Sequence, residues 1–226
     1  MPYRGEMADI DNVIDIENAD LLLTTTKQVR KRLDLNRPVP RELLLECIDV
    51  ASHAPMGGNQ ERNRWIIVDD PEIKAQITPI YQAHGSSYLA ARSEGAEGRQ
   101  ERVVESASFL VQHVADVPAW VVALRLDRVP VGADNFELSS YYGSVAPGVW
   151  SFQLAARARG LGSAWTTFHL AREEQVAEIL GIPPTVTQIA LLPVAYYTGD
   201  KFTPAPRRPA AEITYLNRWK APVTND

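Results

Sequence analysis

The spacing of apolar residues changes along the chain between a helical and a strand-like pattern. Residues 41–53 carry apolar side chains at helical spacing, which predicts an amphipathic helix. Residues 64–69 follow as a strand-like run. Residues 119–124 are apolar on both faces, as in a central strand, and a final strand is expected at 187–197. At 226 residues, the pattern predicts one large domain or two small ones.

The longest predicted helix, 138–159, is apolar nearly all round. This pattern predicts either the buried centre of the domain or a subunit interface. The remaining elements that the pattern predicts are a helix over 21–30 with Asp20 as its N-cap, helices over 72–82, 102–114 and 171–180, and a strand over 163–168.

The segments between these elements differ in composition. Residues 83–102 are polar and alanine-rich and predict a variable helical lid, and residues 127–137 form a second loop. The proline-rich end of the chain is too apolar and aromatic to be disordered filler, so we expect it to lie on another surface. The expected organisation is an acidic arm over 1–19, a domain over 20–198 with a lid and core strand region over 83–137, and a tail over 199–226.

Composition narrows the class of protein. The formal net charge of −5 argues against a nucleic-acid partner. The single cysteine, Cys47, excludes an internal disulfide framework, and its helical surroundings favour a small buried hydrophobe over a reactive thiol. The sequence has neither an apolar leader nor a run of the ~18 apolar residues that a membrane span needs, so we expect a cytoplasmic protein with no membrane partner.

A glycine-rich corner joins the helix over 41–53 to the strand over 64–69. Pro55 ends the helix, and Gly57 and Gly58 allow positive φ angles and a close approach to the backbone. Asn59 adds a short side chain that both donates and accepts hydrogen bonds. The corner is a plausible binding site, and the alternative is a plain surface turn.

Basic side chains gather at separate points of this acidic chain. Lys27, Arg30 and Arg32 lie at a predicted helix end, and Arg207 and Arg208 lie in the tail. Cations placed in this way suggest an anionic ligand such as a phosphate. The alternative is ordinary solvated surface charge.

The segment Trp165-Thr166-Thr167-Phe168 places two hydroxyl groups beside backbone N–H groups, which suits the edge of a polar heterocycle. The alternative is that β-branched residues simply fill a strand. The four histidines are scattered and no metal, nucleophile-elbow, Walker or dinucleotide motif is present. If the protein is an enzyme, we therefore expect a bound cofactor, and no metal, to carry the chemistry.

The order of these motifs resembles the nitroreductase family of FMN-dependent oxidoreductases. Residues 26–30 and then Arg37-Pro38-Val39-Pro40 stand where the family has a basic RRSxR motif and PVP. Residues 54–59 match the start of APSGGNxQPW, and 155–167 match AARALGLGSAWTT. Arg207-Arg208-Pro209 matches a basic pair near the C-terminus. The resemblance covers roughly residues 20–219 and is greatest to nitroreductases of actinobacterial type.

The resemblance implies a fold and an assembly. The fold would be α+β, with a mixed, mostly antiparallel central sheet flanked by helices. Two subunits would form an intertwined homodimer through the helix over 138–159, and the tail would wrap the partner subunit and add a strand to its sheet. Two active sites would then lie at the dimer interface.

The resemblance also implies roles for residues. Thr166 and Thr167 would face the N5 edge of FMN. A hydrogen bond at this edge would tune the reactivity of the flavin, and no side chain would be catalytic. Glu61 and Asn63 depart from the family's Gln and Trp, and Thr26 and Lys27 replace its paired arginines. The other implied cofactor contacts are Lys27, Gln28, Arg30 and Arg207 at the phosphate, and Pro55, Met56, Gly57 and Asn59 at the ring, the last four from the partner subunit.

The implied reaction is a ping-pong hydride transfer through flavin N5. NADPH or NADH would donate the hydride, and a small aromatic acceptor, a nitroaromatic compound or a quinone, would receive it. Two alternatives stay open: dehalogenation or ene reduction on the same scaffold, and a protein that sequesters flavin without turnover.

Overall fold

The computed structural model describes residues 14–223. The chain divides into a central unit, residues 26–200, and a terminal unit formed by the segments before and after it, and each unit is described by itself. The expected acidic arm over 1–19 falls largely on residues 1–13, which lie outside the described residues. No helix in the described range 14–223 is long and apolar enough to cross a membrane.

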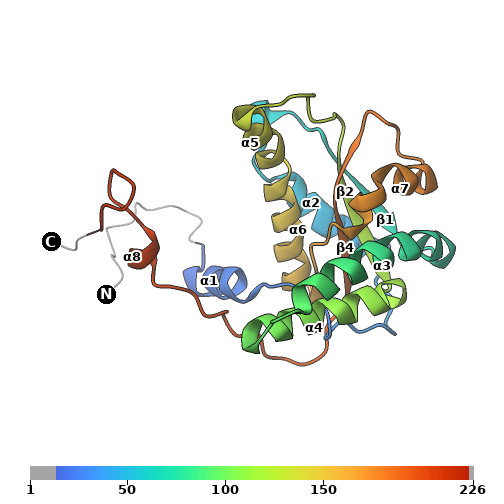
Figure 1. The fold of residues 1–226 in the computed structure, drawn as a ribbon, viewed down its shortest axis with the longest axis horizontal. Helices are drawn as coiled ribbons and strands as arrows, with labels where there is room; N and C mark the ends of the chain where they lie inside the picture. Colours follow the sequence, from blue (N-terminus) through green and yellow to red (C-terminus); the bar gives the residue numbers. More distant parts are fainter. Residues whose placement is uncertain (1–13, 224–226) are drawn as a thin grey trace. The chain divides into compact units, whose positions relative to one another are not determined.

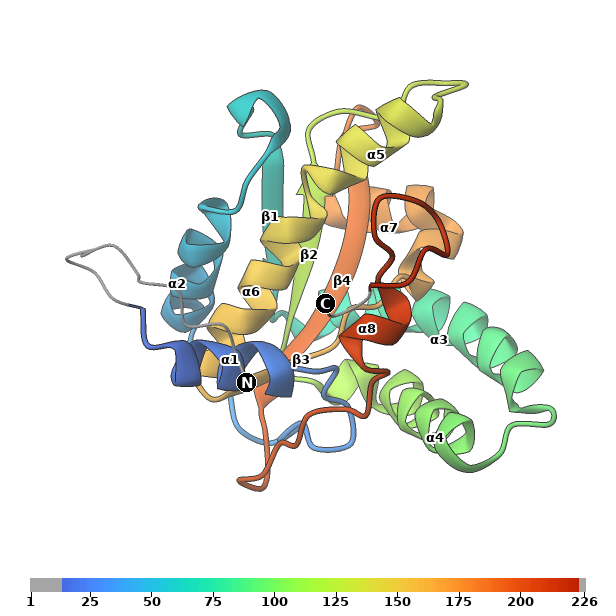
Figure 2. The same cartoon turned by 90° about the vertical axis from the view of Figure 1, so that its left-hand side faces the viewer.

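The central unit is built around a four-stranded sheet with the order β1-β2-β4-β3 (Figure 2). Every pair of neighbouring strands is antiparallel. This arrangement of helices around an antiparallel sheet confirms the predicted fold class. The strands are β1 (Asn63–Val68), β2 (Ala119–Arg125), β3 (Leu161–Ser163) and β4 (Thr187–Tyr196).

Helices α2 (Arg41–Ser52) and α6 (Ala146–Ala158) bury one face of the sheet. Val149 and Phe152 of α6 are fully buried in a cluster that also contains Leu192 of β4. The ring of Phe152 stacks on Trp65 of β1 at 5.7 Å between centroids. Burial of such side chains contributes ~1.5–3 kcal/mol each, so this cluster is the main hydrophobic core.

The opposite face of β2 carries Trp120, whose indole Nε1 donates to Val114 O at 2.9 Å. Val114 begins the short helix η2 (Val114–Asp116). The ammonium of Lys74 is held nearby by the carbonyls of Ala115 and Val117, at 3.1 and 2.8 Å. The helices on this side are α3 (Pro71–Ser93), α4 (Gly98–His113), η3 (Phe168–Arg172) and α7 (Glu173–Leu180) (Figure 1).

The terminal unit contains α1 (Ile16–Thr25) and α8 (Ala210–Ile213). Beyond α8 the chain turns back on itself, with Leu216 N donating to Ala221 O and the Tyr215 ring edge-on to Trp219. The expectation that the tail lies on another surface stays a prediction.

The prediction of a helix over 21–30 is wrong, because α1 begins earlier and ends at Thr25. Asp15, not Asp20, caps it, and its carboxylate accepts from Asn18 N at 3.1 Å. At its end, the Thr25 hydroxyl donates to Leu21 O. The chain from Thr26 onward leaves the helix and pairs with the sheet, so Lys27, Gln28 and Arg30 do not lie at a helix end.

The predicted single helix over 138–159 is two helices, α5 (Asn135–Gly143) and α6. The break precedes Pro147, which stands in the first turn of α6. The start of α5 was missed although Asp134 and Glu137 form a capping box, a pattern visible in the sequence.

The predicted lid over 83–102 is in part a continuation of α3, which runs unbroken to Ser93. Gly85 and Leu89 in this stretch are buried rather than solvated. A Cβ atom at Gly85 would lie 2.8 Å from Val111 Cγ2, so the missing side chain lets α3 and α4 pack closely. The predicted strand over 163–168 likewise shrinks to β3 and one bridge between Thr166 and Leu191.

Cys47 of α2 is fully buried in the core, as the sequence predicted. Burial raises the pKa of its thiol to about 11, which keeps the sulfur protonated at neutral pH.

His169 of η3 is fully buried, and neither ring nitrogen has a hydrogen-bond partner in the described part of the chain. Burial lowers the pKa of this imidazole to about 4. The unfolded chain takes up this proton at a higher pH than the folded chain. The free energy of unfolding therefore has its full value above the unfolded-state pKa and falls as the pH drops toward the folded-state pKa. We expect urea unfolding to show a loss of about 2 kcal/mol from this residue between pH 7.5 and pH 5.

The substitution His169→Leu should remove that component of the pH dependence. The exposed His53 supplies a control for the loss of a histidine as such, through the variant His53→Gln. Equal pH slopes in wild type and His169→Leu would show that the buried imidazole is not the group responsible.

Candidate functional site

The extended segment 26–30 lies along the chain that leads out of β3. Val29 N donates to Ser163 O at 2.9 Å, and the Gln28 side-chain carbonyl accepts from Trp165 N. The structure therefore brings the predicted basic motif and the predicted Trp-Thr-Thr motif together, although they are far apart in the sequence.

Gly162 allows this close approach. A Cβ atom at position 162 would lie 2.9 Å from both Cβ and Cγ1 of Val29, closer than side chains pack. Val29 itself is buried, so it has little room to move away. The glycine in this strand thus sets the position of the residues on either side of Val29.

A cleft of about 430 Å³ opens beside this pairing, and we call it the Arg30 cleft. Its inner wall is formed by Arg30, by Tyr81 of α3 and by the segment Trp165–Phe168. Its outer wall comes from α3 and α4, with His84, Tyr88, Arg92 and Gln100 as its polar members. The volume falls within the range of small-molecule sites in proteins.

Arg30 is a largely buried cation on the wall of this cleft. Desolvation lowers the pKa of its guanidinium, although an arginine stays protonated at neutral pH. No ion pair to Arg30 exists among residues 14–223. Because a buried charge is costly without a counter-charge, the position favours an anionic ligand.

The hydroxyl groups at the inner wall are not equivalent. Thr166 is buried and its hydroxyl donates to Leu191 O at 2.8 Å, so this group can only accept from a ligand. Thr167 is exposed to the cleft, and no described residue accepts its proton. Of the two threonines, Thr167 is the one placed to donate.

Tyr81 contributes a phenol that the sequence analysis missed. It is fully buried, and burial raises the pKa of the phenol to about 12. Its oxygen lies beside the Thr166 hydroxyl, but no well-formed hydrogen bond reaches it from the described residues. A buried polar atom of this kind at the wall of a cleft is commonly satisfied by a ligand or a water molecule.

The glycine corner does not join the Arg30 cleft within one subunit. Its residues 57–59 form the short helix η1, and Gly57 N donates a hydrogen bond to Ser144 Oγ at 3.0 Å. This corner leads into β1, whereas Thr166 pairs with the far edge of β4, roughly 14 Å away across the sheet. Pro55, Met56, Gly57 and Asn59 therefore lie together but apart from Thr166.

Asn63, one of the departures from the family pattern, has a structural contact. Its side-chain amide donates to Ser144 O at 3.1 Å, the residue that also holds Gly57. Both contacts fasten the glycine corner to the junction between α5 and α6. Glu61, the other departure, is exposed.

The two remaining predicted phosphate contacts lie at different places. Lys27 stands on the same extended segment as Arg30 and is exposed. Arg207 belongs to the terminal unit, where its guanidinium donates to Pro206 O at 3.1 Å. The role of Arg207 stays a prediction.

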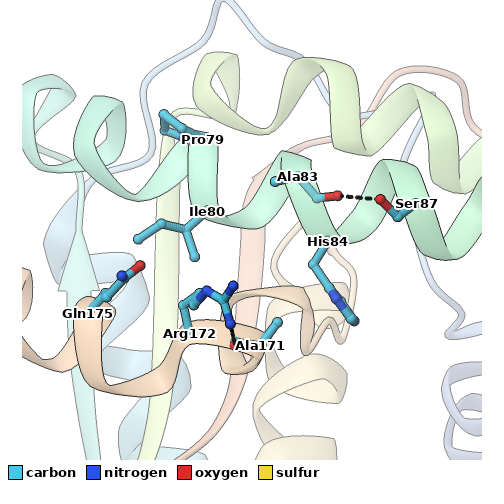
Figure 3. Close-up of a pocket in the computed structure, with 8 residues that line it drawn as sticks. All are labelled: Pro79, Ile80, Ala83, His84, Ser87, Ala171, Arg172 and Gln175. Carbon is cyan, nitrogen blue, oxygen red and sulfur yellow. Dashed lines mark hydrogen bonds between the residues drawn. The ribbon is translucent and has the colours of Figure 1, made fainter.

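A second cavity, of about 700 Å³, lies between α3 and the segment from η3 into α7 (Figure 3). Figure 3 shows Ile80 and His84 of α3 facing Arg172 across it. His84 also lines the Arg30 cleft, so the two cavities share this side chain. No group of three or more possible metal ligands is found in residues 14–223.

The face that α3 turns toward the Arg30 cleft could have been found in part from the sequence. Tyr81 and Tyr88 are separated by two helical turns and share a face with the buried Leu89. The polar composition around them concealed this pattern.

The sequence model of the nitroreductase family matches residues 26–196, and the chain belongs to this family. The iodotyrosine deiodinase of Nematostella vectensis is 22% identical over 95% of this chain and 81% of its own length. That of Thermotoga neapolitana is 24% identical over 84% of this chain and 93% of its own length. The actinobacterial subtype stays a prediction.

Solved structures share the fold at low identity. Oxidized iodotyrosine deiodinase bound to FMN and 3-iodo-L-tyrosine has a TM-score of 0.64 and 23% identity, covering 88% of this chain and 97% of that one. An FMN- and NADPH-dependent nitroreductase derived from Sphigopyxis sp. strain HMH has a TM-score of 0.65 and 15% identity, covering 89% of this chain and 99% of that one.

The tight contact at Gly162 gives a test of how the inner wall is positioned. Gly162→Ala should lower the free energy of unfolding by ~1–3 kcal/mol, because the added methyl group must displace the buried Val29. Urea unfolding measures this change. Gly143→Ala is the matched control, since a Cβ atom there meets nothing within 4 Å, and it should cost little. Equal stabilities of the two variants would contradict the tight pairing.

Proposed function

We propose that the chain is an FMN-dependent oxidoreductase that takes electrons from NADPH or NADH and reduces small aromatic acceptors, nitroaromatic compounds or quinones. The observation that carries this proposal is the arrangement of the Arg30 cleft. A largely buried cation stands beside two threonines and a buried phenol, in a chain of the nitroreductase family, and within residues 14–223 neither the cation has an ion-pair partner nor the phenol a hydrogen-bond partner.

The residues of the cleft fit the parts of FMN. Arg30 and Lys27 would hold the phosphate, because an arginine contact to a phosphate is a strong, charge-assisted hydrogen bond. Gln28 fixes the Trp165 backbone with its side chain and so supports the inner wall rather than offering that group to a ligand. Trp165 and Phe168 add apolar surface for a flat ring.

When bound, FMN would supply the two-electron chemistry that no side chain here provides. The role of the protein is to bind and orient the flavin and to exclude water. The uncommitted hydroxyl of Thr167 can donate to the ring edge, whereas Thr166 keeps the wall in place through Leu191. The proposal keeps Arg207 as a further phosphate contact.

The glycine corner would complete the site from a second subunit. It lies apart from the Arg30 cleft in its own chain. The helix that precedes it, α2, and the helix that contacts η1, α5, both carry exposed apolar side chains. Phe136 is 78% exposed and Leu45 is 57% exposed, which marks a surface suited to a partner. In a homodimer, Pro55, Met56, Gly57 and Asn59 would then contact the partner's flavin.

Dehalogenation is the second candidate reaction. Relatives that align with most of this chain are named iodotyrosine deiodinases, and one related structure holds 3-iodo-L-tyrosine. Ene reduction, and flavin binding without turnover, remain further alternatives on the same scaffold.

Substituting Arg30 tests the phosphate contact. Arg30→Gln should weaken FMN binding about 30-fold, or about 2 kcal/mol, because a charge-assisted contact is lost. Equilibrium dialysis followed by flavin absorbance measures the affinity. Arg172→Gln alters a cation of the second cavity and should leave it unchanged. An unaltered affinity in Arg30→Gln would remove the main support for FMN in this cleft.

Anaerobic mixing of the flavin-loaded protein separates the candidate reactions. NADPH or NADH should bleach the flavin absorbance, and a nitroarene or a quinone should then restore it. A flavin that stays oxidised after mixing would favour sequestration. Colour restored by a halophenol with release of halide, and not by a nitroarene, would favour dehalogenation, and restoration by an activated enone would favour ene reduction.

A further inference from the structure

The outer end of the Arg30 cleft contains a second cation. Arg92 lies near the end of α3, roughly 16 Å along the helix axis from Tyr81 at the inner wall. Gln100, in the first turn of α4, lines the same end. The cleft therefore has cationic groups at both ends, one of which the proposed phosphate contact does not use.

The lining of the whole cleft carries charge of one sign. Its described residues include Arg30 and Arg92 but neither Asp nor Glu, although acidic residues outnumber basic ones in the whole chain, 28 to 23. Glu105 of α4 is directed to an ion pair with Lys31. Because a cleft with one sign of charge concentrates ligands of the opposite sign, its outer end favours an anion.

The contacts of Arg92 hold its side chain without neutralising it. Its guanidinium carbon lies 5.6 Å from the centre of the Tyr88 ring, and Nη1 donates to Tyr88 Oη at 3.3 Å. No carboxylate pairs with Arg92 within the described chain. A guanidinium has five N–H donors, so most of them remain available for a planar carboxylate.

The first turn of α4 adds to this preference. Gln100 places that turn at the cleft, and the N-terminal end of a helix carries partial positive charge. Glu97 and Glu101 stand in the same part of the chain, but neither lines the cleft. The amide of Gln100 can donate to the same anion as Arg92.

We propose that the acceptor is an aromatic carboxylate without an ammonium group, and that Arg92, supported by Tyr88 and Gln100, selects it. This inference rests on the proposed function, because it concerns the acceptor of the same site. An amino acid such as 3-iodo-L-tyrosine carries an ammonium group as well, and no described lining residue offers a carboxylate to receive it. The cations Arg30 and Arg92 in the same lining would also repel that ammonium group, which disfavours the zwitterion.

A comparison of two acceptors tests this selection by turnover. Because 4-nitrobenzoate and its methyl ester differ in intrinsic reactivity, the useful quantity is the ratio of their kcat/KM values. Arg92→Gln should lower the acid-to-ester ratio on the order of tenfold or more through loss of a charge-assisted contact. Arg99→Gln, which changes an arginine of α4 outside the cleft lining, should keep the wild-type ratio.

Calorimetric titration of the flavin-loaded protein tests the same contact without turnover. Benzoate should bind on the order of tenfold more tightly than benzamide, and Arg92→Gln should abolish this difference while the bound FMN per subunit stays the same. L-Phenylalanine should bind no more tightly than benzamide. Equal binding of benzoate and benzamide in wild type, a benzoate preference retained in Arg92→Gln, or tightest binding of L-phenylalanine would overturn the inference.

These readouts separate the two proposals. If the flavin-loaded protein reduces no acceptor, the proposed function fails, whereas a benzoate preference that depends on Arg92 would still support the anion site. Conversely, the protein could bind FMN and reduce both nitro compounds with an acid-to-ester ratio that Arg92→Gln does not change. This result would support the proposed function and contradict the inference about Arg92.

Discussion

The pairing of the extended segment 26–30 with the chain beyond β3 is the contact on which the candidate site depends. It consists of one backbone hydrogen bond from Val29, one side-chain contact from Gln28 and the absence of a side chain at Gly162. Moving Val29 outward would carry Arg30 away from Thr166 and Tyr81. The electrostatics of the cleft, a partly buried cation beside hydroxyl groups, therefore follow from a packing constraint in the sheet.

On the proposed function, a second constraint follows, because one subunit would hold only part of the site. Ser144 fastens the glycine corner to the junction of α5 and α6, on the side of the sheet remote from Arg30. An exposed corner held by Ser144, in a chain whose helices α2 and α5 carry exposed apolar side chains, suits contact with a second copy of the chain. On this account, folding, dimerisation and flavin binding stabilise one another, because each buries surface that the others leave open.

Parts of this structure were predictable because local sequence determines them. The uniformly apolar run of β2 predicts a central strand, and the helical setting of Cys47 predicts its burial. The extended conformation of Gln28 and Arg30 was not predictable, because it depends on a partner strand distant in sequence. Pro147 and the capping box at Asp134 are visible in the sequence and indicate two helices. The continuous apolar run was nevertheless interpreted as one helix. The cleft's outer wall, with Arg92, depends on how two polar helices pack, which periodicity does not reveal.

The most direct test of the central claim is a crystal structure of the protein with FMN. The account predicts the phosphate within hydrogen-bond distance of the Arg30 guanidinium and the ring edge beside Thr167, with the glycine corner of the partner subunit against the ring. A phosphate bound away from Arg30, with the ring outside the cleft formed by Tyr81 and Thr166, would contradict it.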